Sequence, residues 1–296
     1  MRVAVLGSGS GGNAVVVESN GRRILVDAGF SCRQIEKRLA GLDETGLDET
    51  GLDAVTGSAA APIEALLLTH EHQDHCRGAA VFLRRHQVPV YATAGTLKAL
   101  GRAFRKTEPE TRTVRSGEPF EIAGADPAFR VEAFGIPHDA REPVGFVIED
   151  AEGCRVGLVA DLGSRTQLAW GRLRDLDCLL LETNHDLSML RTGPYPWHIK
   201  QRIASRHGHL SNGEAAAGLP ELVNDRLRSV VLYHLSETNN LPVLAVQEIG
   251  ETLAAVGCGA EVTVTRQDAA TPWIEIEKSP LAVPRPLAGS RQLLLW

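Results

Sequence analysis

The feature that most constrains this chain is a cluster of potential metal ligands within residues 64–78. The run Ala65–Leu68 is apolar, bounded by polar residues and too short for a helix, so we predict a buried strand. Three histidines and an aspartate follow within six residues: His70, His72, Asp74 and His75. The first three are spaced two apart, so an extended or looped backbone can direct them to the same side. His75 breaks this spacing, which suits a second metal beside the first.

Imidazole and carboxylate groups without thiolate favour zinc, manganese or iron over a sulfur-rich structural site. The alternative is a polar loop that is rich in histidine by chance. Three of the ten histidines gather here, however, and the context suits a site. A buried strand precedes the cluster, and Gly78 and the helical pattern of Ala79–Arg85 follow it. We therefore predict a metal site.

Composition sets outer limits on the function. At 296 residues, with 43% hydrophobic residues, the chain can form one large or two small domains. A net charge of −6 argues against a general polyanion binder, although a local patch can override it. Five scattered cysteines without a CxxC pair favour reduced thiols. No apolar stretch approaches the roughly 20 residues of a membrane span, so we expect a cytoplasmic protein without a membrane partner.

The start of the chain contains a false match to a nucleotide-binding motif. Residues 7–12 fit G-x-G-x-x-G, and Asp27 stands about 20 residues on, where a dinucleotide-binding fold has an acid. That motif requires a helix to begin at the glycines. The β-branched run Val15–Val17 and the Asn20-Gly21 turn instead predict an antiparallel hairpin. We predict that Asp27, at the end of a buried strand, supports the metal loop through hydrogen bonds.

Four later segments also place a histidine or an acid directly after a predicted buried strand. Functional side chains are often held at such positions by a rigid scaffold. A single histidine there is usually structural, but four strand ends together with the first cluster favour a shared site. The residues concerned are His138, Asp161, Glu182 with His185, and His234.

These residues add up to a predicted dinuclear centre that holds two divalent metal ions, zinc or manganese. The first metal is assigned to His70, His72 and His138. The second is assigned to Asp74, His75 and His234. Asp161 is predicted to bridge the two ions. Two metals about 3.5–4 Å apart lower the pKa of a shared water and hold both oxygens of a hydrolytic displacement.

The segment Thr69–His75 resembles the HxHxDH motif of the metallo-β-lactamase superfamily. His138, Asp161 and His234 match the later motifs of that superfamily in order and approximate spacing. Within the superfamily the chain is similar to the YycJ (WalJ) type of small bacterial hydrolases, through residues 7–13, 181–186, 208–212 and 234–240. The resemblance implies an α/β metallo-β-lactamase fold, a four-layer αβ/βα sandwich with two mixed β-sheets.

We expect a single hydrolase domain over residues 1–278. Two segments depart from the family pattern. An acidic repeat at 42–53 is predicted to be a solvated insert loop, and residues 279–296 form a Pro-rich C-terminal tail. Neither segment contains a motif residue of the site.

The resemblance also implies a nuclease-like phosphodiesterase, similar to a 5′-to-3′ DNA exonuclease, with a role in DNA repair. No acidic residue lies between Asp186 and Glu214. Basic and aromatic residues in that segment can hold phosphates and stack bases, or form a solvated basic face. The predicted substrate-binding residues are Arg191, Tyr195, Lys200, Arg202 and Arg206. The expected partner is nucleic acid, DNA rather than RNA, and the sequence leaves open whether the chain forms a homodimer.

The predicted mechanism is attack of a metal-bridging hydroxide on a phosphorus atom, with Asp74 in the catalytic set. The proton donor to the leaving group is predicted to be His209 or His185, with Glu182 orienting one of them. The alternative for all three is hydrogen bonding within loops. Because a fold does not determine chemistry, hydrolysis of a small thioester, lactone or β-lactam competes with the nuclease hypothesis. A regulatory protein without turnover is a third hypothesis, against which the intact ligand set argues.

Overall fold

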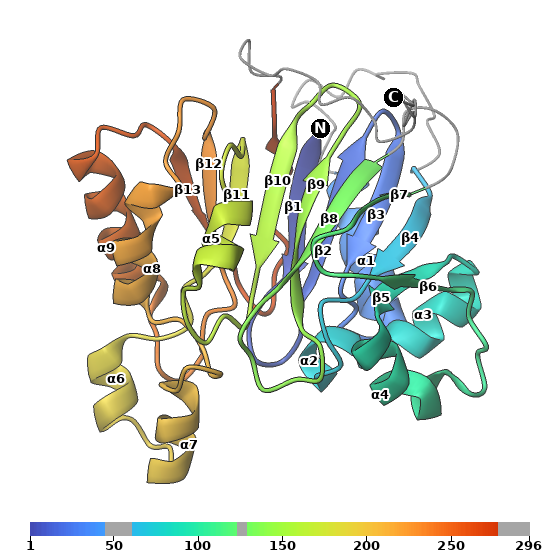
Figure 1. Cartoon of the computed structure of the whole chain (residues 1–296), viewed down its shortest axis with the longest axis horizontal. Helices are drawn as coiled ribbons and strands as arrows, with labels where there is room; N and C mark the ends of the chain where they lie inside the picture. Colours follow the sequence, from blue (N-terminus) through green and yellow to red (C-terminus); the bar gives the residue numbers. More distant parts are fainter. Residues whose placement is uncertain (45–60, 123–128, 278–296) are drawn as a thin grey trace, which may run out of the picture.

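The computed structural model describes residues 1–44, 61–122 and 129–277. Two β-sheets pack face to face, and helices cover the outer face of each (Figure 1). The first sheet has the strand order β14-β1-β2-β3-β4-β5-β6. Its strands are β1 (Arg2–Gly7), β2 (Ala14–Ser19), β3 (Arg22–Val26), β4 (Ile63–Leu67), β5 (Val90–Thr93), β6 (Thr111–Val114) and β14 (Ile274–Glu275). The sheet is mixed, because β1 to β3 pair antiparallel and β3 to β6 pair parallel.

The second sheet has the order β13-β12-β11-β10-β9-β8-β7 and is also mixed. Strands β10 to β13 are parallel to one another, whereas β7 to β10 are antiparallel. Its strands are β7 (Pro119–Ile122), β8 (Phe129–Gly135), β9 (Val144–Glu149), β10 (Arg155–Val159), β11 (Cys178–Glu182), β12 (Ser229–Tyr233) and β13 (Glu261–Val264).

In the described part of the chain, three helices pack on the outside of each sheet. The first sheet is covered by α1 (Cys32–Glu44), α3 (Ala79–His86) and α4 (Ala94–Phe104), and the second by α5 (Gln167–Arg172), α8 (Asn212–Gly218) and α9 (Pro242–Ala255). In β1, Val3 and Val5 belong to the core between the sheets, and Ala4 and Leu6 to the core under the helices. Strands buried on both faces have continuous apolar runs, which explains why they could be predicted. The predicted four-layer α/β sandwich is confirmed.

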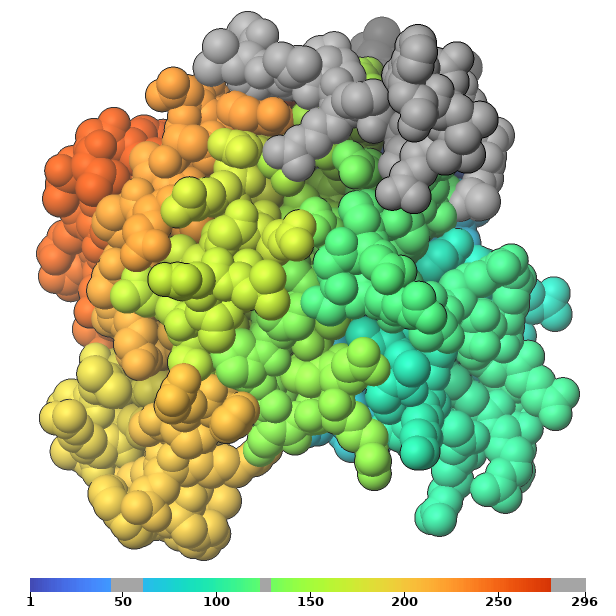
Figure 2. All heavy atoms as spheres, viewed as in Figure 1, coloured from blue at the N-terminus to red at the C-terminus, as the bar shows by residue number. Residues whose placement is uncertain are grey.

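The remaining helices are short and lie between strands. They are α2 (Gln73–Cys76), α6 (Leu187–Thr192), α7 (Trp197–Ile203) and the 3₁₀ helix η1 (Leu219–Glu221). Helices α6 and α7 project from one end of the sandwich (Figure 1), where Figure 2 shows them as a separate lobe. We call residues 187–203 the α6–α7 lobe. Within the described residues, no helix combines the length and the apolar character needed to cross a membrane.

Two features of the N-terminal region can be compared with the predictions. The glycine-rich segment leads into β2, and β2 pairs antiparallel with β1 and, across the Asn20-Gly21 turn, with β3, as predicted. Helix α1 was predicted to end at Ala40, and this is wrong, because the helix continues to Glu44. Leu42 extends the buried stripe of Ile35 and Leu39 and holds the extra turn against the core. The first residues of the predicted insert loop are therefore helical, whereas 45–53 and the tail 279–296 lie outside the described residues.

Candidate metal centre

The predicted ligands converge at one edge of the two sheets. They follow β4, β8, β10 and β12, except for Asp74 and His75, which lie in the short helix α2. Three residues within two positions of the end of a buried strand have left-handed backbone angles, with φ of 61° at Asp27, 53° at Asp161 and 57° at His234. Non-glycine residues seldom adopt this conformation. Its recurrence at three strand ends is typical of a functional site, where surrounding structure maintains uncommon backbone geometry.

Six of the seven predicted ligands form two neighbouring groups. Candidate ligand atoms of His70, His72 and His138 all lie within 4.8 Å of one another. The same holds for Asp74, His75 and His234. These are the two sets that the sequence assigned to separate metals, and their role as ligands stays a prediction.

Asp161 lies between the two groups. Its Oδ2 atom is 2.8 Å from His75 Nε2, and its Oδ1 atom is 3.6 Å from His138 Nε2. Oδ1 is also 3.7 Å from His234 Nε2. One carboxylate therefore contacts members of both groups, which is the position that a bridging ligand requires.

The electrostatics of the centre favour a bound cation. Burial opposes charge on His75, but Asp161 and Asp27 raise its pKa well above the ordinary value. Burial opposes charge on His234 too, but Asp161 and Asp74 raise its pKa to about 10. The carboxylates thus attract positive charge into a buried site.

His70 shows the complementary property. Burial and the neighbouring His75 lower the pKa of His70 well below its ordinary value. Its Nε2 atom is buried and has no hydrogen-bond partner among the described residues. Because buried polar atoms are nearly always paired, a neutral imidazole nitrogen in this state is suited to a metal ion. The donor set therefore fits divalent metals.

Asp27 contacts the Nδ1 atom of His75, on the side of the ring opposite Nε2. It is fully buried, and its Oδ2 lies 2.7 Å from His75 Nδ1, while its Oδ1 accepts a 2.9 Å hydrogen bond from the Thr69 backbone N–H. This contact directs His75 Nε2 towards the centre, because a carboxylate at one ring nitrogen fixes the orientation of the other. The supporting role predicted for Asp27 agrees with these contacts.

The glycine-rich loop supplies further support that sequence reasoning missed. Asn13 Nδ2 lies 3.1 Å from His75 Nε2, and Asn13 Oδ1 accepts a 2.9 Å hydrogen bond from the Ser8 hydroxyl. Ser8 Oγ in turn accepts from the backbone N–H of His234 at 2.8 Å. The segment 7–13 was identified only through a family resemblance, and its contacts with two strand ends explain its place beside the metal motifs.

Gly29, in the loop between β3 and α1, provides a test of how closely that loop must approach the ligands. A Cβ atom at Gly29 would lie 1.7 Å from the backbone oxygen of Asp74. We expect Gly29→Ala to displace α2, lower the melting temperature and reduce bound metal per chain. Metal analysis and thermal unfolding measure both. The control Gly41→Ala lies in α1 with no atom near the added Cβ, and should be neutral or stabilising; equal metal content in both variants would contradict the prediction.

Glu182 connects His209 with the second ligand group. Its Oε1 lies 2.9 Å from His209 Nδ1 and 3.0 Å from His234 Nδ1. Its Oε2 accepts backbone hydrogen bonds from Leu162 and Leu210, at 2.6 and 3.1 Å. Burial opposes ionisation, but His209 and His234 lower the pKa of Glu182 to about 2. Glu182 is thus an anchored carboxylate that orients two imidazoles rather than one.

The other predicted site residues divide into two sets. A cavity of about 250 Å³ lies over the ligands, and Tyr195 and Arg202 of the α6–α7 lobe line it together with His209. Arg202 Nε donates a 2.6 Å hydrogen bond to Asp139. His185 is buried, with Nδ1 3.3 Å from the Asn184 side-chain oxygen. The cavity is not lined by four of the predicted residues: His185, Arg191, Lys200 and Arg206.

Known proteins similar to this chain belong to a family of hydrolases, which agrees with a metal centre at this position. Residues 22–235 match the model of the Beta-lactamase superfamily domain. The chain is 32% identical to the exodeoxyribonuclease YycJ of Bacillus anthracis, over 88% of this chain and 91% of that protein. It is also 32% identical to the exodeoxyribonuclease WalJ of Streptococcus pneumoniae, over 93% of this chain and 98% of that protein.

A solved structure shows the same fold. Zinc-bound PqqB from Methylobacterium extorquens superposes with a TM-score of 0.64 at 24% identity, covering 92% of this chain and 99% of that one. The matched family model spans most of the chain, including the strand ends that carry the ligand motifs. The chain therefore belongs to the metallo-β-lactamase superfamily and is a metal-dependent hydrolase.

Proposed function

We propose that this hydrolase is a dinuclear phosphodiesterase that degrades DNA as a 5′-to-3′ exonuclease, in the cytoplasm and in DNA repair. The observation that carries the proposal is the 32% identity to two proteins named exodeoxyribonucleases over nearly the full length of each chain. The lining of the metal cavity supports it. In this lining, Arg202 supplies a guanidinium that can bind a phosphate, and Tyr195 supplies an aromatic ring on which a base can stack.

The two ligand groups and Asp161 would hold two divalent ions, zinc or manganese, which would activate water as the nucleophile and supply the positive charge that a scissile phosphate requires. The chain's own residues have distinct tasks around them. Asp74 contacts His75, and Asp161 contacts both His75 and His138, so negative charge lies among the histidines of both groups. Arg202 binds a phosphate oxygen. Arg191 and Lys200 of the lobe, and Arg206 just beyond it, attract the phosphates of the DNA strand outside the cavity.

His209 is the proton donor in this proposal. Its Nδ1 hydrogen bonds to Glu182, so Nε2 is the nitrogen that transfers a proton to the leaving oxygen. His185 does not share the role, because it is buried and does not line the cavity. Hydrolysis of a small thioester, lactone or β-lactam has no comparable support, since a basic lobe serves a polyanionic substrate better than a small neutral one.

The test is metal-dependent cleavage of DNA. The protein is incubated with 5′-labelled single- and double-stranded DNA in Mn²⁺, Zn²⁺ or a chelator, beside an Asp74→Ala variant. We expect release of labelled mononucleotide from the 5′ end with metal, and none with chelator or with the variant. A 3′-labelled substrate tests the direction of digestion, and RNA of the same sequence tests whether the enzyme requires deoxyribose. If neither single-stranded nor double-stranded DNA is cleaved in a metal-dependent way, the proposal is refuted.

A further inference from the structure

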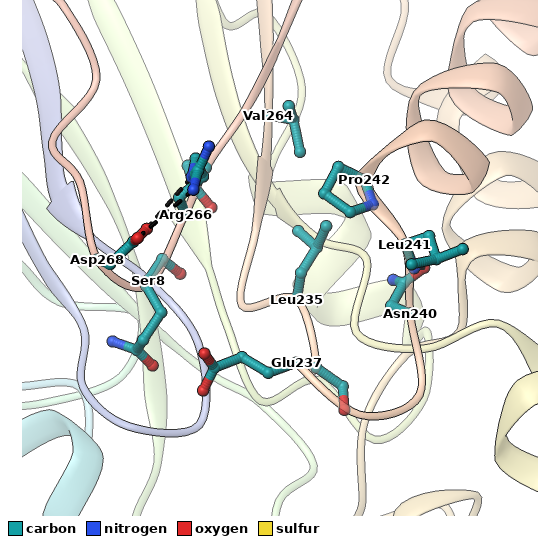
Figure 3. Close-up of a pocket in the computed structure, with 12 residues that line it drawn as sticks. Ser8, Leu235, Glu237, Asn240, Leu241, Pro242, Val264, Arg266 and Asp268 are labelled. Carbon is teal, nitrogen blue, oxygen red and sulfur yellow. Dashed lines mark hydrogen bonds and ion pairs between the residues drawn. The ribbon is translucent and has the colours of Figure 1, made fainter. Parts of the chain in front are cut away.

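A second and larger cavity adjoins the metal centre. It has a volume of about 590 Å³ and is shown in Figure 3. Ser236 lines both this cavity and the one over the ligands. Leu235 and Ser236 directly follow His234, and Ser8, which also lines the larger cavity, accepts the hydrogen bond from the His234 N–H. The larger cavity is thus built on the same strand end that carries a candidate ligand.

The two cavities differ in what they can hold. Pockets for small molecules are usually about 300–1,000 Å³. The cavity over the ligands falls below this range at about 250 Å³, so a nucleotide whose phosphate lies there needs neighbouring space for its sugar and base. The adjoining 590 Å³ cavity provides that space.

The lining of the larger cavity is apolar on one side and polar on the other. Leu235, Pro242 and Val264 form the apolar side in Figure 3, and the Arg266–Asp268 pair lies across from them. Arg266 Nε is 3.2 Å from Asp268 Oδ1, so these two charges compensate each other. Glu237 also lines the cavity and has no ion pair within residues 1–44, 61–122 and 129–277.

The resulting charge excludes a phosphate. The lining residues carry two acids against one arginine, so a phosphate inside would be repelled. A flat, uncharged group with hydrogen-bond donors is not repelled by these charges. Aliphatic side chains can pack against the faces of a ring, and a carboxylate accepts hydrogen bonds from the amino groups of a base.

We propose that this cavity binds the nucleobase of an unpaired nucleotide next to the scissile phosphate, with Glu237 accepting from the amino group of cytosine or guanine. The inference rests on the proposed nuclease function and narrows its substrate to single-stranded or frayed DNA ends. In a duplex the amino groups of cytosine and guanine are engaged in base pairing, so the base must be unpaired before it can enter.

The test fills the cavity without touching the metal centre. Leu241 lines the cavity at the start of α9 and is 49% exposed, so Leu241→Trp narrows the cavity at low risk to folding. The matched control is Leu168→Trp on α5, which is 58% exposed and does not line the cavity. The substrates are deoxycytidine 5′-(p-nitrophenyl phosphate) and methyl p-nitrophenyl phosphate, which carries no base.

We expect Leu241→Trp to raise KM for the nucleoside ester about tenfold and to leave the methyl ester unchanged, because only the base contact is lost. Leu168→Trp should match the wild type with both. Glu237→Gln should raise KM for the deoxycytidine ester more than for the thymidine ester, since thymine has no amino group. Equal effects on the base-bearing and base-free esters would overturn the proposal.

A direct binding measurement separates this inference from the nuclease function. Saturation-transfer NMR with deoxycytidine, which has no phosphate, reports the cavity without turnover. Signal in the wild type and in Leu168→Trp, lost in Leu241→Trp, supports the base site even if no DNA is cleaved. A wild-type protein that cleaves DNA but gives no deoxycytidine signal retains the nuclease function and refutes the base site.

Discussion

Replacing Asp161 by asparagine is expected to lower turnover of DNA more than about 1,000-fold, equivalent to a barrier about 4 kcal/mol higher. The carboxylate lies within 4 Å of His75, His138 and His234, so it reaches both ligand groups. Asparagine keeps the shape and removes the charge. His75 and His234 then lose the anion that raises their pKa, and the site loses attraction for cations.

The measurement is turnover of 5′-labelled DNA together with metal content per chain. Asp175→Asn is the matched control, because Asp175 has nearly the same left-handed backbone, with φ of 57° against 53° for Asp161, and an exposed side chain. Asparagine tolerates that conformation, so both variants should fold. We expect the metal content to fall only in Asp161→Asn. Full turnover and full metal content in that variant would remove Asp161 from the centre.

The candidate centre could be predicted because its parts are local in sequence. The first cluster lies within six consecutive positions, and each later candidate ligand lies within three residues of the end of a largely buried strand. Such strands, buried on both faces, form a strong signal in sequence. His185 shows the limit of this reasoning. It stands three residues after Glu182, yet its side chain is buried away from the cavity, and proximity in sequence does not report side-chain direction.

The helices of the lobe and the larger cavity could not be predicted from the sequence, and the reasons are physical. Helix α7 has no buried residue, so it has no apolar stripe with helical spacing to detect. Strand β6 has three exposed residues out of four at a sheet edge and is equally inconspicuous. The larger cavity combines Ser8 with residues 235–237, 240–242 and 264–268, which meet only when the two sheets are assembled. No local pattern marks such a combination.

Removing the His209 imidazole is expected to separate proton transfer from metal binding. In His209→Ala we expect turnover of DNA to fall about 100-fold or more, the usual contribution of a general acid. Metal content should be spared, because Glu182 still contacts His234 at 3.0 Å and accepts its two backbone hydrogen bonds. The exposed neighbour His207→Ala is the control and should behave as the wild type.

The leaving group decides between a proton donor and a positioning residue. The leaving sugar oxygen of DNA must be protonated, whereas p-nitrophenolate departs as a stable anion. A proton donor therefore matters for DNA and little for thymidine 5′-(p-nitrophenyl phosphate), and we expect His209→Ala to retain most activity on the ester. Equal loss on both substrates would mean that His209 acts through the position of Glu182 and His234, and loss of metal would assign it to the ligand shell.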